Sequence, residues 1–114
     1  MSKSKEKIYD EFYTAVNMAP KELEEWLQTD NSQNVGQDSG DGEAIGHKSG
    51  KKIIAIKKKN KANLSEADYD HMNKVVGYIN RHKAQQPDSG IKTSNWRYSL
   101  KNWGYDPCKE LNCD

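Results

Sequence analysis

Residues 64–85, LSEADYDHMNKVVGYINRHKAQ, form the stretch that decides the fold of this chain. Apolar side chains recur in it at spacings of three and four, which places them on one face of an α-helix. These side chains are Tyr69, Met72, Val75, Val76 and Ile79. Ser65 can cap the backbone N–H groups at the helix start, with Asp68 as its acidic partner three residues later. We therefore predict a long amphipathic helix that supplies one wall of a core, with Lys74 and Arg81 together on its outer side.

Two shorter helices are predicted near the N-terminus. Ile8, Phe12 and Val16 recur at helical spacing between residues 6 and 16. Pro20 suits the first position of the second helix, because the N–H group that proline lacks would have no partner there. The buried stripe of that helix is predicted to consist of Leu23, Trp26 and Leu27. Together the two segments predict a helical hairpin that is acidic on its outer side.

A basic helix is predicted over residues 43–60, after a polar loop over residues 29–42. The loop consists of turn-forming and polar residues apart from Val35. One face of the helix is apolar at about 100° per residue, and we expect it to carry Ile45, Ser49, Ile53 and Ile56. The opposite side carries the lysines with His47. Ile54 falls among the lysines, where burial is not expected, so we predict that it contacts a partner.

A short Trp-rich helix is predicted near the C-terminus. Thr93 or Ser94 can cap its start, and Gly104 can close its end. Its apolar residues recur at spacings of four and three, and they are Trp96, Leu100 and Trp103. Base stacking by Trp96, Tyr98 and Trp103 is the functional alternative. Core packing is favoured, because a chain with only 33% hydrophobic residues needs these rings inside.

These patterns predict an all-α fold with a single small domain of about five helices. A chain of 114 residues is long enough for one core and too short for two comfortable domains. The expected boundaries are a flexible N-terminus over 1–5, a helical domain over 6–107 and a flexible tail over 108–114. Cys108 and Cys113 lie too close together and too near the end to staple a core, so we expect reduced thiols.

Charge is distributed unevenly along the chain, although the net charge is only +1. Residues 1–47 hold four lysines against ten acidic residues, whereas residues 48–61 hold seven lysines and no acid. Residues 62–114 hold seven charges of each sign. A molecule of this kind can present a basic face while its overall charge stays near neutral.

The preferred function is therefore non-catalytic binding to DNA through phosphates, with low sequence specificity. Several lysines on one helix face release counterions from the phosphate backbone. The basic helix contains no arginine to read base edges bidentately. The primary candidates for phosphate contact are Lys48, Lys51, Lys52, Lys57, Lys58, Lys59 and Lys61. The secondary candidates are Arg81, Lys83, Arg97 and Lys101.

Two alternatives remain open at this point. The lysines can be a solvated helix face without a partner, which is the usual role of a lysine run. The protein can also be a protein–protein interaction module that uses the face around Ile54, or the acidic hairpin, to dock on a partner. An interface centred on Ile54 would depend less on salt than phosphate binding does.

No enzymatic activity, cofactor or small-molecule substrate is expected. No Ser, Cys or Lys lies in a recognisable nucleophile motif, and no glycine-rich loop is present that could hold phosphates. No metal site is expected either. His71 and His82 are eleven residues apart on one predicted helix, roughly 16 Å at 1.5 Å per residue. The loop over 29–42 lacks the ligand spacing of an EF-hand.

Four ordered blocks resemble a known family: VNMAPKELEEWL, GDGEAIGHKSGKKI, DYDHMNKVVGYINRH and WRYSLKNWGYDP. The family comprises short bacterial and fungal proteins classed as a domain of unknown function and often labelled "DNA-binding protein". The resemblance covers residues 8–107 and implies a nucleic-acid role. It also implies a possible small partner, because members tend to accompany a Tudor-like β-barrel protein. It implies no active residues, since none are established for the family.

The sequence contains neither an apolar run long enough to span a membrane nor a secretory signal at its start. We therefore expect no membrane association and an intracellular location. That location would be the cytoplasm, at the nucleoid, in a bacterium, and the nucleus is possible in a fungus.

Overall fold

The computed structural model describes residues 4–35 and 45–111, and every regular element in these ranges is helical. The α-helices are α1 Lys5–Ala15, α2 Pro20–Leu27, α3 Asp30–Asn34, α4 Ile45–Lys57, α5 Glu66–Lys83 and α6 Asn95–Asn102. Three short 3-10 turns complete the elements, and they are η1 Lys61–Asn63, η2 Ile91–Thr93 and η3 Pro107–Lys109. The predicted all-α fold is confirmed.

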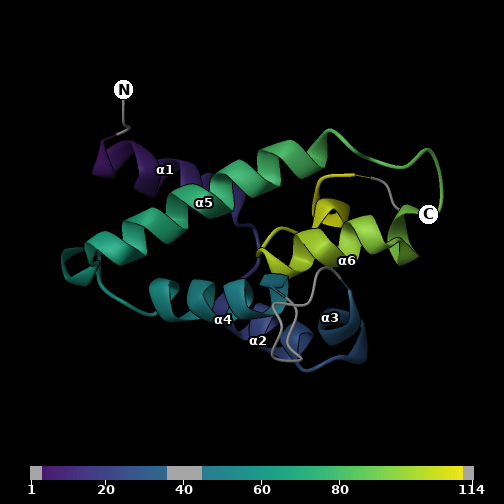
Figure 1. The fold of residues 1–114 in the computed structure, drawn as a ribbon, viewed down its shortest axis with the longest axis horizontal. Coiled ribbons are helices and arrows are strands. Elements are labelled where there is room, and N and C mark those ends of the chain that lie inside the picture. The colour runs from purple at the N-terminus through teal and green to yellow at the C-terminus, as the bar shows by residue number, and fades with distance from the viewer. Residues whose placement is uncertain (1–3, 36–44, 112–114) are drawn as a thin grey trace.

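Helix α5 forms one long wall of the molecule, and α1 packs along it (Figure 1). The predicted capping box is present, because the backbone N–H of Asp68 donates to Ser65 Oγ over 3.1 Å. The backbone N–H of Ser65 in turn donates to Asp68 Oδ2 over 3.0 Å. The predicted core face of α5 is buried along its whole length, and it consists of Tyr69, Met72, Val75, Val76 and Ile79. Local capping and apolar periodicity thus account for this helix.

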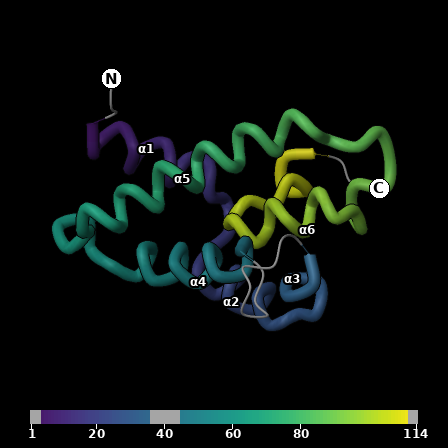
Figure 2. The backbone as a smooth tube through the Cα atoms, in the orientation of Figure 1, coloured from purple at the N-terminus to yellow at the C-terminus, as the bar shows by residue number. Residues whose placement is uncertain are grey.

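Helix α6 lies between α4 and α5 and contacts both, while α2 packs against α4 (Figure 2). Ser94 caps α6 by accepting a hydrogen bond from the backbone N–H of Arg97, and Gly104 follows the helix with a φ of 84°. That left-handed conformation favours glycine. Gly50 allows α4 to approach its neighbours closely. A Cβ atom there would lie 2.7 Å from Leu27 Cδ2 and 2.8 Å from the backbone oxygen of Asn102.

The side chain of Asn102 joins α6 to α2 and α3 inside the core. Its Oδ1 accepts hydrogen bonds from Trp26 Nε1 over 2.8 Å and from Ser32 Oγ over 2.6 Å. Its Nδ2 donates to the backbone oxygen of Ser32 over 3.0 Å. Asn102 is 1% exposed, so water cannot replace these partners. Buried polar groups of this kind are stable only when their hydrogen bonds are satisfied.

Two predicted boundaries are wrong in part. Residues 30–34 of the predicted loop 29–42 form α3, since Thr29 caps this helix and Ser32 is buried against Asn102. Residues 36–42 of that loop lie outside the described residues. At the other end, the predicted tail begins inside η3, where Lys109 Nζ donates to the backbone oxygen of Asn17 over 2.9 Å.

The predictions for the N-terminus and for Cys108 also differ from the structure. Ser4 and Lys5, assigned to a flexible terminus, belong to the cap and first turn of α1. Residues 1–3 and 112–114 lie outside the described residues. Cys108 is disulfide-bonded, which corrects the expectation of a reduced thiol at this position, and Cys113 lies outside the described residues.

Gly50→Ala is expected to destabilise the fold by about 1–3 kcal/mol, because the added methyl group would overpack the contact among α4, α2 and α6. Gly77→Ala is the matched control within a helix. A Cβ there meets only the end of the Arg81 side chain, at 3.3 Å, so the better helix propensity of alanine should leave stability equal or raise it by up to about 1 kcal/mol. Urea unfolding measures both changes. Equal effects of the two substitutions would contradict the close approach at Gly50.

Candidate functional site

The predicted run of lysines does not continue along one helix. α4 ends at Lys57, so Lys58 and Lys59 lie in the following turn and Lys61 begins η1. Lys57 is half-buried, and its Nζ donates to the backbone oxygen of Met18 over 3.1 Å. Burial lowers the pKa of Lys57, and the charge of Lys109 lowers it further. This lysine therefore anchors the end of α4 to the segment between α1 and α2.

The three lysines after α4 also contact other parts of the chain. Lys58 Nζ lies 3.6 Å from Glu24 Oε2, and Lys59 Nζ lies 2.7 Å from Asp68 Oδ2. The Lys61 ammonium lies 4.5 Å from the centroid of the Tyr9 ring. Such surface contacts contribute about 0–1 kcal/mol each, so phosphate could still displace them. They do reduce the charge that this segment presents to a ligand.

The secondary candidates near α6 are engaged in contacts that hold the fold together. Arg97 forms a two-pronged ion pair with Asp106, with its Nε at 3.0 Å and its Nη2 at 3.1 Å from the two carboxylate oxygens. Burial alone would raise the pKa of Asp106, but the hydrogen bonds from Arg97 lower it. The Lys101 ammonium lies 4.1 Å from the Trp26 ring, and the Lys83 ammonium lies 5.0 Å from the Tyr105 ring.

A different group of cations lies along the contact between α4 and α5. His71 of α5 and Ser49 of α4 share a hydrogen bond of 3.0 Å between Nε2 and Oγ. Burial lowers the pKa of His71 to about 4, and the charges of Lys52 and Lys74 act in the same direction. Lys52 therefore approaches His71 from α4, and Lys74 approaches it from α5.

Arg81 extends this group along α5. Its guanidinium lies over Gly77, where an added Cβ atom would be 3.3 Å from Arg81 Nη1. Burial raises the pKa of Tyr78, and the charge of Arg81 opposes that rise. Lys74, Tyr78 and Arg81 also follow helical spacing on one side of α5. The exposed residues Lys52, Lys74 and Arg81 are named here the cationic seam. Within residues 4–35 and 45–111, none of the three forms an ion pair with a carboxylate.

Four stacked rings form the floor beneath the cationic seam, and they are named here the aromatic ladder. His71 and Trp103 stack with centroids 6.2 Å apart and an interplanar angle of 18°. Trp103 and Tyr78 stack at 4.1 Å and 13°, and Tyr78 and His82 stack at 5.0 Å and 21°. The ladder fixes the rings rigidly, because the ring faces are covered by one another.

A family model described as "Protein of unknown function (DUF3140)" matches residues 11–101, which include α2 to α5 and most of α6. The chain belongs to this family. Membership confirms the expected family of unknown function and assigns no role to any residue of the DUF3140 protein. Comparisons with curated proteins and with solved structures find no match.

Two sequence predictions about α4 are wrong. His47 was expected on the basic side, but it is 7% exposed and its Nε2 donates to the backbone oxygen of Leu27 over 2.8 Å. Ile54 was expected to be exposed among the lysines, but it is half-buried and packs at the edge of the core. Both side chains turn toward α2, because α2 covers the side of α4 that would otherwise face solvent.

Lys48 and Lys52, one turn apart, share the side of α4 that leads to His71. Lys51 instead borders the groove between α2 and α4. The predicted site residues did not include His71, Lys74 or Tyr78. Their spacing of three and four along α5 places them on one side, beside Arg81, but periodicity does not reveal that Trp103 inserts between His71 and Tyr78.

No cluster of three or more His, Cys, Asp or Glu side chains able to hold a metal ion occurs among residues 4–35 and 45–111. None of the helices described there combines the length and the apolar character that a bilayer span requires.

His71 provides a direct test of the cationic seam. It is neutral in the folded protein, and an unfolded chain would bind a proton more readily, near the ordinary pKa of 6.5. The contribution of His71 to the free energy of unfolding is therefore fully present above pH 6.5, and it is lost as the pH falls toward 4. Lys52→Gln and Lys74→Gln should each raise the pKa of His71, as measured by NMR titration of its ring. Lys92→Gln, on η2, is the control and should leave it unchanged.

Proposed function

We propose that this protein binds nucleic acid without catalysis, through phosphate contacts made by the cationic seam. The observation that carries this proposal is the alignment of three exposed cations from two helices, none of which has an acidic partner in the described part of the chain. Lys48 lies one turn from Lys52 and extends the same side of α4. An anionic polymer can therefore bind Lys52, Lys74 and Arg81 without breaking an ion pair among the described residues.

The aromatic ladder supports this proposal because it holds α4, α5 and α6 in one arrangement under the seam. A rigid base keeps the cations at a constant spacing, which reduces the entropy lost on binding. Lys52 and Lys74 also lie on opposite helices, so a phosphate strand along the seam meets charge from both sides. The seam contains no Asn or Gln to read adenine, and its cations are expected to bind phosphates, which carry no sequence information. We therefore expect low sequence specificity.

The salt dependence follows from the number of phosphate contacts. Three contacts predict a slope of about −2 to −3 for the logarithm of the binding constant against the logarithm of salt concentration. Binding should therefore weaken roughly 20- to 40-fold between about 50 and 200 mM salt. Fluorescence anisotropy of labelled duplex and single-stranded DNA measures this slope directly.

The variant Lys52→Gln, Lys74→Gln, Arg81→Gln should lose about tenfold or more in affinity at about 50 mM salt, and its salt slope should approach zero. Two controls remove the same number of charges. Lys7→Gln, Lys21→Gln, Lys92→Gln changes exposed lysines on α1, α2 and η2, and Lys58→Gln, Lys59→Gln, Lys61→Gln changes the lysines that follow α4.

The three variants separate the competing explanations. Loss confined to the seam variant supports the proposal. A larger loss of affinity in the Lys58, Lys59 and Lys61 variant would mean that DNA binds the lysines after α4, as the sequence predicted, and not the cationic seam. Equal losses in all three would mean that only total charge matters, and no binding by the native protein at low salt would end the nucleic-acid proposal.

A groove between α2 and α4 supports a second candidate function, docking of a small protein. The groove has a volume of about 420 Å³, with Leu27 and Ile54 as its apolar residues and Glu24, Lys51 and Lys58 among its charged ones. Mixed charge around an apolar floor is typical of a protein-binding surface. The resemblance to proteins that accompany a Tudor-like barrel names one candidate partner.

Ile54→Glu should abolish such a complex while leaving DNA binding unchanged, because Ile54 lies on the α2 side of α4 and the seam lies on the α5 side. Mixing the purified protein with a Tudor-like companion and measuring the complex by calorimetry at low and moderate salt checks this. Thr93→Glu introduces the same single negative charge at an exposed position on η2, outside this groove, and serves as the control. A complex that survives Ile54→Glu would exclude the groove as its interface.

A further inference from the structure

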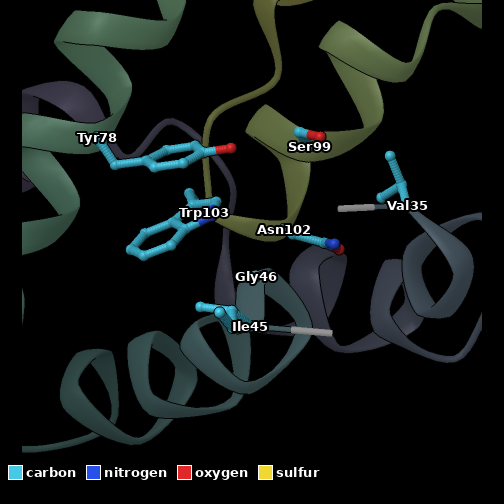
Figure 3. A pocket seen from close by; sticks show the side chains of 7 residues that line it. All are labelled: Val35, Ile45, Gly46, Tyr78, Ser99, Asn102 and Trp103. Atoms are coloured by element: carbon cyan, nitrogen blue, oxygen red, sulfur yellow. The ribbon is translucent and has the colours of Figure 1, made fainter. Parts of the chain in front are cut away.

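A small cavity opens beside Tyr78 and Trp103 of the aromatic ladder (Figure 3). Arg81, the seam residue next to Tyr78 in charge and in helical spacing, lies at this end of the cationic seam. The volume of the cavity is about 150 Å³. The cavity is formed by α4, α5, α6 and the C-terminal end of α3. The residues that line it are Val35, Ile45, Gly46, Tyr78, Ser99, Asn102 and Trp103. Ile45 is the exposed large hydrophobic side chain of the described residues, so the cavity coincides with an apolar surface open to solvent.

Trp103 differs from the other two tryptophans in its hydrogen bonding. Trp26 Nε1 donates to Asn102 Oδ1 over 2.8 Å, and Trp96 Nε1 donates to the backbone oxygen of His82 over 2.6 Å. The Nε1–H group of Trp103 donates to no acceptor, as judged over residues 4–35 and 45–111. Every fully buried side-chain nitrogen or oxygen in these ranges has a hydrogen-bond partner. The Trp103 Nε1 atom is therefore not fully buried.

The Trp103 N–H faces the space left by Gly46. A Cβ atom on Gly46 would lie only 3.1 Å from Trp103 Nε1. Glycine at this position thus keeps the donor open to the cavity, and any larger side chain would fill the space in front of it. Indole N–H is a donor only, so a ligand in the cavity must present an acceptor to it.

Tyr78 supplies a second polar group at the same cavity. Its hydroxyl lies beside that of Ser99, across the cavity from Val35 (Figure 3). A tyrosine hydroxyl both donates and accepts, so it can donate to a ligand while Ser99 donates to it. The cavity therefore combines apolar walls, from Val35 and Ile45, with two donors on ring edges.

We propose that this cavity binds one unpaired, pyrimidine-sized nucleobase, whose carbonyl oxygens accept hydrogen bonds from Trp103 Nε1–H and Tyr78 O–H. A cavity of comparable size elsewhere accommodates a single six-membered ring. The phosphate attached to that nucleotide would lie toward Arg81, next to Tyr78. This inference rests on the proposed nucleic-acid binding and specifies its form: single-stranded DNA or RNA binds more tightly than duplex, and pyrimidines bind more tightly than purines.

The three indole N–H groups provide a direct readout by ¹⁵N–¹H NMR. Adding oligo(dT) should shift the Trp103 indole resonance strongly, while the Trp26 and Trp96 resonances stay in place because their N–H groups are already bonded within the fold. Oligo(dA) should shift the Trp103 resonance less. Thymidine monophosphate alone tests whether a free nucleotide suffices: a shift with it but not with oligo(dT) would assign the cavity to a free nucleotide.

Two substitutions test the cavity, with a matched control. Ser99→Leu fills it, and Tyr78→Phe removes one donor without adding bulk; both should reduce the shift of Trp103 and the preference for single strands at least several-fold. Tyr98→Phe, on the same helix but beside Trp26, should change neither. Three separate, dispersed indole resonances show that a variant is folded.

The outcomes separate this inference from the proposed function. If DNA binding depends on the seam but no probe moves the Trp103 resonance, the nucleobase cavity is refuted and phosphate binding stands. If all three indole resonances move together, the change is global and the cavity assignment is refuted. If native protein binds no DNA but thymidine monophosphate moves Trp103, polymer binding fails and the cavity remains as a nucleotide site.

Discussion

The amide of Asn102 is the constraint on which the rest of the structure depends. It lies at the end of α6 and holds Trp26 of α2 and Ser32 of α3, which are 76 and 70 residues away in the chain. Both its oxygen and its nitrogen are bonded, and leaving such a buried group without a partner would cost about 1–3 kcal/mol. Gly50 lets α4 approach the backbone of the same residue. These contacts fix where α6 can lie, so one residue links α6 to α2, α3 and α4.

The position of α6 also creates the candidate site. With Asn102 fixed, the next residue, Trp103, inserts between His71 and Tyr78 and completes the aromatic ladder. The same placement brings Gly46 in front of the Trp103 N–H group. The cationic seam on α4 and α5 then lies along a rigid floor rather than on two separately mobile helices. The same packing therefore builds the core and the proposed binding surface. The ring faces of Trp103 stack on His71 and Tyr78, and its N–H group faces the cavity.

Helices α5 and α3 show which features can be predicted from neighbouring residues and which depend on distant ones. For α5 and its cap, apolar periodicity and the Ser65–Asp68 capping box act within a few residues, and the helix follows the prediction closely. For α3, turn-forming residues predicted a loop, but Ser32 reaches a buried partner on α6. Composition cannot reveal a partner 70 residues away. The same limit explains Ile54 and His47, whose burial depends on α2 covering a side of α4 that the helical pattern alone assigns to solvent.

The sequence by itself determined the helical class, the positions of the main helices, the family and the presence of excess lysine. Each of these follows from spacing, capping or composition along the chain. Only the tertiary structure decided which cations stay available, because availability depends on what lies opposite each side chain. Lys57 reaches the Met18 carbonyl, Lys59 reaches Asp68 and Arg97 reaches Asp106. Lys52, Lys74 and Arg81 come together because two helices pack side by side, and charge pairing across a fold is a property of distances in space.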